Sequence, residues 1–250
     1  MMKILVCISN VPDTTTKIKL AADRKSVDTA GIQWVINPWD ELALTRALEL
    51  KETSGGTIEK VSVATVGTSE VEPTLRKALA IGADDAFRVD ANPADAYQAA
   101  AELAAMLKVN PYDIILCGIE SSDYNGSAFG GMLAELLETS SVSSVSSLSI
   151  AEGQLLLTRE IDGGKETLAS PIPLVAIVQK GISIEARIPS MRGIMTARSK
   201  PLLIIPACGA ASLTSVSVLD LPAPKAACQM VDAENAAELV RLLHQKAKVI

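Results

Sequence analysis

Over the first 137 residues, the hydrophobic and polar positions alternate between two kinds of segment. Short apolar runs typical of buried strands precede longer segments whose apolar positions recur at helical spacing. The predicted strands are Lys3–Ile8, Ile32–Ile36, Lys60–Val66, Ala86–Val89 and Asp113–Cys117. The predicted helices begin at Asn37-Pro38, Ser69 and Asp95, and a fourth reaches about Leu137 after a loop over Gly118–Gly126. This repetition predicts an α/β fold, a doubly wound and mostly parallel sheet with helices on both faces.

The start of the first predicted helix carries several favourable signals. Asn37 is expected to cap this helix, because Asn is favoured at the N-cap and Pro38, which follows it, is favoured at the first helical position. Asp40 and Glu41 then place negative charge at the positive end of the helix dipole.

The pattern changes after Glu138. Four apolar or alternating segments predict an antiparallel extension of the same sheet, or a small cap on it: Ser140–Ile150, Leu155–Arg159, Glu166–Ala169 and Leu174–Val178. In the stretch that follows, Pro189, Gly193 and Pro201 are expected to interrupt any regular element. Leu202–Cys228 has no strong period and predicts an extended arm, which ends in a helix over about Ala233–Lys246.

Composition narrows the class of protein. Of the 250 residues, 48% are hydrophobic and 21% charged, which excludes disorder for most of the chain. A net charge of −6 argues against a nucleic-acid binder held by bulk electrostatics. No apolar run reaches the roughly 18 residues that span a bilayer, and the first residues lack the pattern of a secretory leader. We therefore expect a cytoplasmic protein, or a mitochondrial matrix protein in a eukaryote, that is not integral to a membrane.

Cysteine and histidine usage excludes several kinds of site. The four cysteines are far apart, at Cys7, Cys117, Cys208 and Cys228. A disulfide framework or a zinc site would need tighter clustering. The single histidine, His244, lies near the end of the last predicted helix. A cation that interacts with the C-terminal end of the helix dipole is a simpler interpretation of this residue than a catalytic base.

Ligands of open α/β sheets bind beyond the carboxyl ends of the strands, where the strand order switches. Three segments should meet there: Cys7–Asp13, Val66–Ser69 and the loop after Cys117. That loop is rich in Gly, Ser and Ala and leads into a helix, which lets backbone N–H groups approach a phosphate. An ordinary glycine-rich loop is the alternative, because neither a Walker A motif nor G-x-G-x-x-G is present.

Two further features lie near these segments. The ring of Trp39 could lie against an adenine or a flavin, or simply pack between helix and sheet. Four carboxylates could form an acid–base cluster or be solvated loop charges: Asp13, Asp40, Glu120 and Asp123.

The basic stretch 187–200 contains Arg187, Arg192, Arg198 and Lys200 and no acid. Apolar side chains stand between these charges, at Ile188, Met191, Ile194 and Met195. This mixture suits a promiscuous protein contact, and a solvated loop with a few buried anchors is the alternative.

Several stretches together resemble the beta (small) subunits of electron transfer flavoproteins. They are KILVCISNVPDT, VINPWDELALTRALELKE, VATVGTSEVEPTLRKALAIGADDA, DIILCG with its loop, REIDGGKET with IPLVAIV, and RIPSMRGIMTARSKP. The resemblance covers Met2–Lys200 and the C-terminal helix and is weakest over Leu202–Cys228. It implies an electron carrier rather than an enzyme, with no catalytic side chain. It also implies a domain that binds AMP structurally over 1–186, a partner-recognition loop over 187–200 and an arm with a helix on the alpha subunit over 201–250.

The resemblance places the AMP site on residues that match the family's motifs. They are Cys7, Asn37, Pro38, Trp39, Asp40, Val66, Gly118, Ile119, Glu120, Ser121, Ser122, Asp123, Tyr124, Asn125, Gly126, Ser127, Ala128 and Phe129. The loop differs from the family's usual sequence at Ile119-Glu120 and at Asn125–Ala128. We therefore expect contacts to the nucleotide from the backbone more than from side chains. The same departure favours AMP over the second FAD that the electron-bifurcating branch binds at this place.

The resemblance also implies partners. Electrons would come from acyl-CoA and other flavin-dependent dehydrogenases and pass to a quinone-linked oxidoreductase, through an FAD held with a larger alpha subunit. The partner-binding residues would be Glu160, which faces an Arg of the alpha subunit, and Arg187, Ile188, Pro189, Met191, Ile194 and Met195 of the recognition loop. Thr14 stands where some relatives place a Tyr near the flavin.

Two other classes of nucleotide-binding protein fit the sequence less well. An adenylating pyrophosphatase of related topology would need Ser-Gly-Gly-x-Asp-Ser after its first strand, whereas Ser54-Gly55-Gly56 ends a predicted helix. A nucleotide-sensing stress protein, a pure binding module, would be shorter and would lack the chain beyond Ile182.

Overall fold

The computed structural model describes residues 1–151, 153–225 and 227–250. Its strands are β1 (Met2–Cys7), β2 (Asn10–Pro12), β3 (Trp34–Ile36), β4 (Ile58–Val66), β5 (Asp85–Asp90), β6 (Ile114–Gly118), β7 (Ser140–Ala151), β8 (Gln154–Ile161), β9 (Gly164–Ser170), β10 (Leu174–Val178) and β11 (Leu202–Pro206). Its helices are α1 (Pro38–Thr53), α2 (Glu72–Ile81), α3 (Ala96–Val109), α4 (Phe129–Leu136), α5 (Met191–Ala197) and α6 (Ala236–Leu242), with a 3₁₀ turn η1 (Ser69–Val71) and a π turn η2 (Leu243–Ala247).

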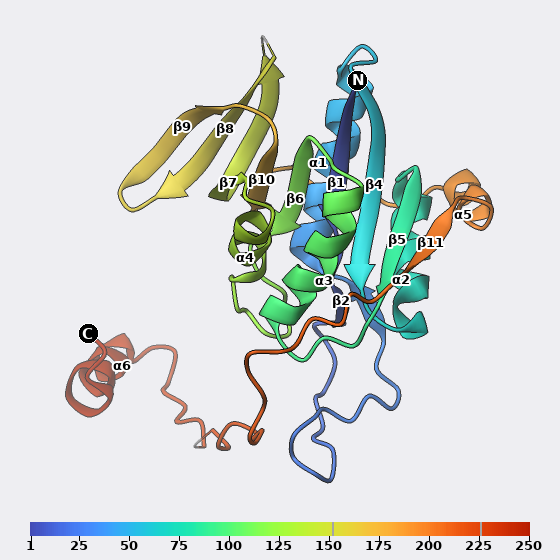
Figure 1. Ribbon diagram of the computed structural model, residues 1–250. Coiled ribbons are helices and arrows are strands. Elements are labelled where there is room, and N and C mark those ends of the chain that lie inside the picture. The colour runs from blue at the N-terminus through green and yellow to red at the C-terminus, as the bar shows by residue number, and fades with distance from the viewer. Residues whose placement is uncertain (152, 226) are drawn as a thin grey trace.

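One sheet runs through the molecule in the order β11-β5-β4-β1-β6-β10-β7-β8-β9 (Figure 1). The strands from β11 to β7 are parallel, and β8 and β9 extend them as an antiparallel hairpin. The predicted α/β class and antiparallel extension are therefore confirmed. The prediction that Leu174–Val178 belongs to that extension is wrong, because β10 lies between β6 and β7 and is parallel to both. The predicted strand ending at Ile36 pairs only with β2, in a separate two-stranded ribbon.

Two hydrophobic clusters cover the two faces of the sheet. Alternate residues of β1 show the division: Ile4 and Val6 pack with α1 and α2, while Leu5 and Cys7 pack with α3 and α4. A strand that is buried on both faces needs apolar residues at successive positions. This requirement explains the unbroken apolar runs of β1, β6 and β10.

The C-terminal region differs from its predicted form at two places. Gly193 does not interrupt the basic stretch, because Met191–Ala197 forms α5. The arm begins with a strand, since Leu202–Pro206 pairs in parallel with β5 at the edge of the sheet. The rest of the arm runs along the carboxyl ends of the strands, and α6 lies away from the body (Figure 1). In the described ranges, no helix combines the length and the apolar character needed to cross a bilayer.

Candidate functional site

The candidate site lies at the carboxyl ends of β1, β4 and β6. From β1 the chain steps outward to β4 and β5, then returns to β6 on the other side of β1. The strand order therefore reverses between β1 and β6, which is where open α/β sheets bind ligands. The structure brings together here the three segments that the sequence predicts, and α1 begins against them.

Asn37 joins α1 to the loop after β6. Its Nδ2 donates to the Glu120 carbonyl at 2.9 Å, and its Oδ1 accepts from the Ser122 N–H at 3.2 Å. The prediction that Asn37 caps α1 is wrong for its side chain, which makes no cap hydrogen bond. The residue stands at the cap position, but its amide is buried and is used to hold a segment 83 residues away.

Asp40, in the first turn of α1, joins the ends of β1 and β6. One carboxylate oxygen accepts from the Ser9 N–H at 2.8 Å, and the other accepts from the Gly118 N–H at 2.9 Å. Burial raises the pKa of Asp40 from its ordinary 3.8 to about 6, and the bonds from Ser9 and Gly118 only partly oppose the shift. Its carboxyl is thus a buried structural link.

Gly118 allows α1 to approach β6 this closely. A Cβ at this position would lie 2.5 Å from Asp40 Oδ1 and 2.8 Å from Trp39 Cβ. Any larger residue would therefore push the first turn of α1 away from the end of β6.

Arg88 fixes the loop after β4, and sequence reasoning missed it. Its guanidinium is buried and donates to the Gly67 carbonyl at 2.9 Å, to Asp90 at 2.5 Å and to Glu72 at 3.1 Å. The signal was an arginine inside the apolar strand Ala86–Val89. Val66, the residue of this loop that the sequence predicts in the site, is half-buried at the end of β4.

The glycine-rich loop leads into an uncapped helix. The N-cap residue of α4 is Ala128, whose side chain makes no cap bond. The N–H groups of Phe129, Gly130 and Gly131 have no carbonyl within their own helix to bind. Ile119–Ser122, Ala128 and Phe129 are half-buried, whereas Asp123–Ser127 are exposed.

Two thiols lie beneath this loop. Cys117 Sγ is 3.9 Å from Cys7 Sγ, and both side chains are buried. The thiol of Cys117 and burial together raise the pKa of Cys7 well above its ordinary value. The Cys7 side chain is therefore a neutral thiol at physiological pH.

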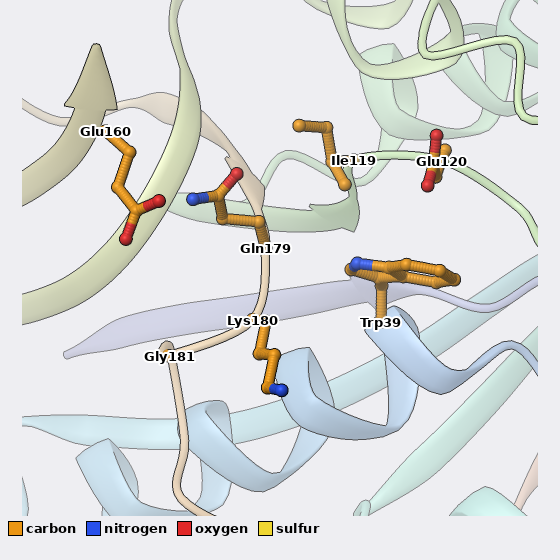
Figure 2. A pocket seen from close by; sticks show the side chains of 7 residues that line it. All are labelled: Trp39, Ile119, Glu120, Glu160, Gln179, Lys180 and Gly181. Atoms are coloured by element: carbon orange, nitrogen blue, oxygen red, sulfur yellow. The ribbon is translucent and has the colours of Figure 1, made fainter. Parts of the chain in front are cut away.

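Trp39 borders an open hollow of about 450 Å³ between the ends of β6, β8 and β10. In Figure 2 its indole lies flat below Ile119 and Glu120, while Glu160 points from β8 toward Gln179. Glu160 thus belongs to the same hollow as Trp39, although 120 residues separate them in sequence. Pro38 is exposed beside it.

The four carboxylates that could have formed one acid–base cluster each have separate surroundings. Asp13 accepts from Thr15, Asp40 is buried as described, and Glu120 lines the hollow. Asp123 is exposed and accepts from the Tyr124 N–H. Within the part of the chain that the structure describes, no group of three or more His, Cys, Asp or Glu side chains is placed to hold a metal ion.

The basic stretch forms a separate exposed surface around α5. The exposed fractions of Ile188, Met191 and Met195 are 86%, 77% and 72%, and Ile194 is also exposed. Arg187 forms a two-point ion pair with Glu52, and Pro189 lines a groove of about 540 Å³ between α5 and α2. The apolar side chains of this surface therefore face outward from a fixed base.

Comparison with known proteins identifies the family. A family model of the electron transfer flavoprotein domain matches residues 25–208. The electron transfer flavoprotein subunit beta of Syntrophomonas wolfei is 37% identical over 228 residues, 90% of this chain and 88% of that protein. The Bacillus subtilis subunit beta is 34% identical over the whole of both chains, and the human subunit beta is 30% identical over 99% of each. The chain therefore belongs to the electron transfer flavoprotein family, as a beta subunit.

Proposed function

We propose that this chain binds AMP at the ends of β1, β4 and β6 and pairs with an alpha subunit that holds most of the FAD contacts. The observation that carries the proposal is that Asn37 and Asp40 join the start of α1 to the end of β1 and to the loop after β6, which leads into an uncapped helix. The two side chains tie α1 to β1 and to the loop after β6. A nucleotide bound here would complete this junction and has a structural role.

The residues present fit an adenylate. The free N–H groups at the start of α4 suit a phosphate, because the helix dipole favours negative charge there. Gly130 and Gly131 carry no side chain in the approach to those groups. The other residues predicted for the site would surround the nucleotide mainly through the backbone: Cys7, Asn37–Asp40, Val66 and Gly118–Phe129.

The FAD shared with the alpha subunit supplies the electron-transfer chemistry when bound. The chain contributes placement and recognition. Glu160, which is exposed at the hollow beside Trp39, would receive an Arg of the alpha subunit. The arm and α6 would pack on that subunit. The surface of α5 would dock flavin-dependent dehydrogenases, including those for acyl-CoA, and electrons would leave to a quinone-linked oxidoreductase in the cytoplasm or the mitochondrial matrix.

Mass spectrometry of small molecules released from the purified heterodimer tests the proposal. One FAD and one AMP per pair is the expected result. Two FAD molecules would replace it with the bifurcating alternative. The chain expressed without its partner should be colourless between about 400 and 500 nm, because the flavin belongs mainly to the alpha subunit.

A binding assay separates this function from that of a stress-protein-like nucleotide sensor. We expect AMP to bind more tightly than ATP and the alpha subunit to be recovered in pull-downs. Preference for ATP, with no alpha partner, would favour the sensor.

A further inference from the structure

The side-chain chemistry of Cys7 and Cys117 has no part in the function proposed above. Cys7 is the last residue of β1, and Cys117 lies one residue before the end of β6. The two sulfur atoms are 3.9 Å apart in the hydrophobic cluster under α3 and α4. The chain's other two cysteines, Cys208 and Cys228, are exposed on the arm.

The backbone geometry permits a bond between the two sulfurs. β1 and β6 are hydrogen-bonded neighbours, and Val6 pairs with Leu116, so Cys7 and Cys117 are the next opposed positions. Adjacent strands are about 4.8 Å apart, which lies within the roughly 4.4–6.8 Å that separates the Cα atoms of disulfide-bonded residues. The pair lies just past the last position at which β1 and β6 pair with each other, while Cys7 still pairs with Ala64 of β4 and Cys117 with Ile177 of β10.

The glycine-rich start of α4 covers these thiols. A Cβ on Gly130 would lie 3.6 Å from Cys117 Sγ. Cys7 and Cys117 are only 5% and 1% exposed, so an oxidant must enter past the loop and the first turn of α4. These same elements form the proposed phosphate site, and a bound nucleotide would hold them closed.

We propose that Cys7 and Cys117 form an oxidation site, at which a hydroperoxide produces an intramolecular disulfide when the nucleotide site is empty. One sulfur attacks a peroxide oxygen and loses its proton, the O–O bond breaks, and the leaving hydroxide takes the proton, which gives a sulfenic acid and one water. The second sulfur then attacks the sulfenic sulfur, the S–S bond forms, and the S–O bond breaks. The proton of the second thiol joins this leaving hydroxide as a second water. Two thiols and one hydrogen peroxide give one disulfide and two waters, so the thiols are oxidised and the peroxide is reduced.

The disulfide has a structural consequence at the switch point. It draws the ends of β1 and β6 together, and these ends carry the Ser9 and Gly118 N–H groups that bind Asp40. The oxidised chain should therefore retain AMP less well than the reduced chain. The expected loss of AMP from the oxidised chain, like the expected protection of the thiols by nucleotide, rests on the proposed AMP site.

The test uses the full chain with Cys208→Ser and Cys228→Ser, so that only the buried pair can react. The chain, dialysed free of nucleotide, is exposed to hydrogen peroxide with and without excess AMP, then unfolded for thiol counting and peptide mapping. We expect both thiols to be lost without AMP, a linked peptide containing Cys7 and Cys117, and recovery of both thiols with dithiothreitol. AMP should slow the loss. The further variant Cys117→Ala should give no linked peptide.

Each outcome bears on one of the two proposals. Two thiols that survive peroxide, or sulfinic acids without a linked peptide, overturn the oxidation site even if AMP binding is measured. A disulfide that forms equally fast with and without bound AMP supports the thiol pair as an oxidation site, but it overturns the dependence on an empty nucleotide site and contradicts the position proposed for the nucleotide.

Discussion

Two polar side chains in one helical turn, Asn37 and Asp40, connect three parts of the chain that are remote in sequence. Both are buried and both use their oxygen atoms as acceptors for backbone N–H groups. Leaving a buried N–H without a partner costs about 1–3 kcal/mol. The geometry of the candidate site therefore depends on these two residues more than on any exposed side chain of the loop.

The buried carboxyl of Asp40 should make stability depend on pH. Its pKa rises from 3.8 to about 6 on folding, so the native state holds the proton more tightly than the unfolded chain. Its contribution to the free energy of unfolding is then fully present below about pH 4 and is lost as the pH rises through about 6, a change of about 3 kcal/mol.

Urea unfolding of the wild type and of Asp40→Asn, from pH 4 to 7.5, measures this change in the free energy of unfolding. The stability of the wild type relative to the variant should fall as the pH rises. The exposed acid variant Glu59→Gln should show no such trend, and a constant difference for Asp40→Asn would contradict the prediction.

Gly118→Ala should destabilise the fold and open the site. The new Cβ would meet Asp40 and Trp39 at 2.5 and 2.8 Å, so the start of α1 must shift, at a cost of roughly 1–3 kcal/mol. The free energy of unfolding measures the effect. Gly126→Ala, in the same loop, is the control for stability, because a Cβ there meets no atom within 4 Å. Equal stability of the two variants would show that α1 does not pack on β6 as described.

At the scale of elements, α5 is held in place by its neighbours and exposes its apolar side chains. A Cβ on Gly193 would lie 2.3 Å from the Ala80 carbonyl, so glycine lets α5 lie directly on α2. Arg76 donates to the carbonyls of Ala197 and Lys200, both at 2.8 Å, and so anchors the end of the helix. These contacts hold the inner side of α5 against α2, while Ile188, Met191 and Met195 remain exposed.

Met191→Ala should weaken docking of a dehydrogenase by roughly 1–3 kcal/mol without changing the flavin content, since one exposed apolar anchor is removed. Electron-transfer kinetics with increasing dehydrogenase concentration measure the change. Val109→Ala, an equally exposed apolar residue at the end of α3, is the matched control and should behave as the wild type. Unchanged rates from every cognate dehydrogenase for Met191→Ala would contradict the role of α5.

At the scale of the whole molecule, the arm is bound to the body in its first part and separate in its second. The carboxylate of Glu102 on α3 accepts from the N–H groups of Cys208, Gly209 and Ala210 at 2.6–3.0 Å. Asp95 accepts from the next segment, at Leu213 and Thr214. These bonds set the course of the arm before any partner binds, which lowers the ordering cost of association.

Glu102→Gln should release the first part of the arm. An amide replaces one acceptor oxygen with a donor, which faces backbone N–H groups, so at least one of the three bonds is lost. Limited proteolysis should cut within residues 208–214 several-fold faster than in the wild type, while the sheet remains intact by circular dichroism. Glu135→Gln, an exposed acid on α4, should leave the cleavage rate unchanged. Equal rates for Glu102→Gln and wild type would show that the carboxylate does not hold the arm.

The sequence by itself determined the layered α/β architecture and which segments meet at the candidate site. Apolar runs such as Lys3–Ile8 and Asp113–Cys117 can be buried only in a sheet covered on both faces, and the alternation with helices requires parallel strands. The end of β1 and the loop after β6 then had to meet at one edge. These features follow from periodicity within a few residues, which is a local property of the chain.

Only the tertiary structure decided how that edge is held together. Asn37 was expected to serve its own helix, but packing places it against the loop after β6, where its amide bonds to backbone groups of Glu120 and Ser122. Gly193 was expected to interrupt regular structure, but it lies within α5 where that helix contacts α2. Leu202–Pro206 was expected to be irregular, but it pairs as a strand with β5. Each of these outcomes depends on a neighbour far away in the chain, and local spacing carries no information about which buried N–H or carbonyl will need a partner.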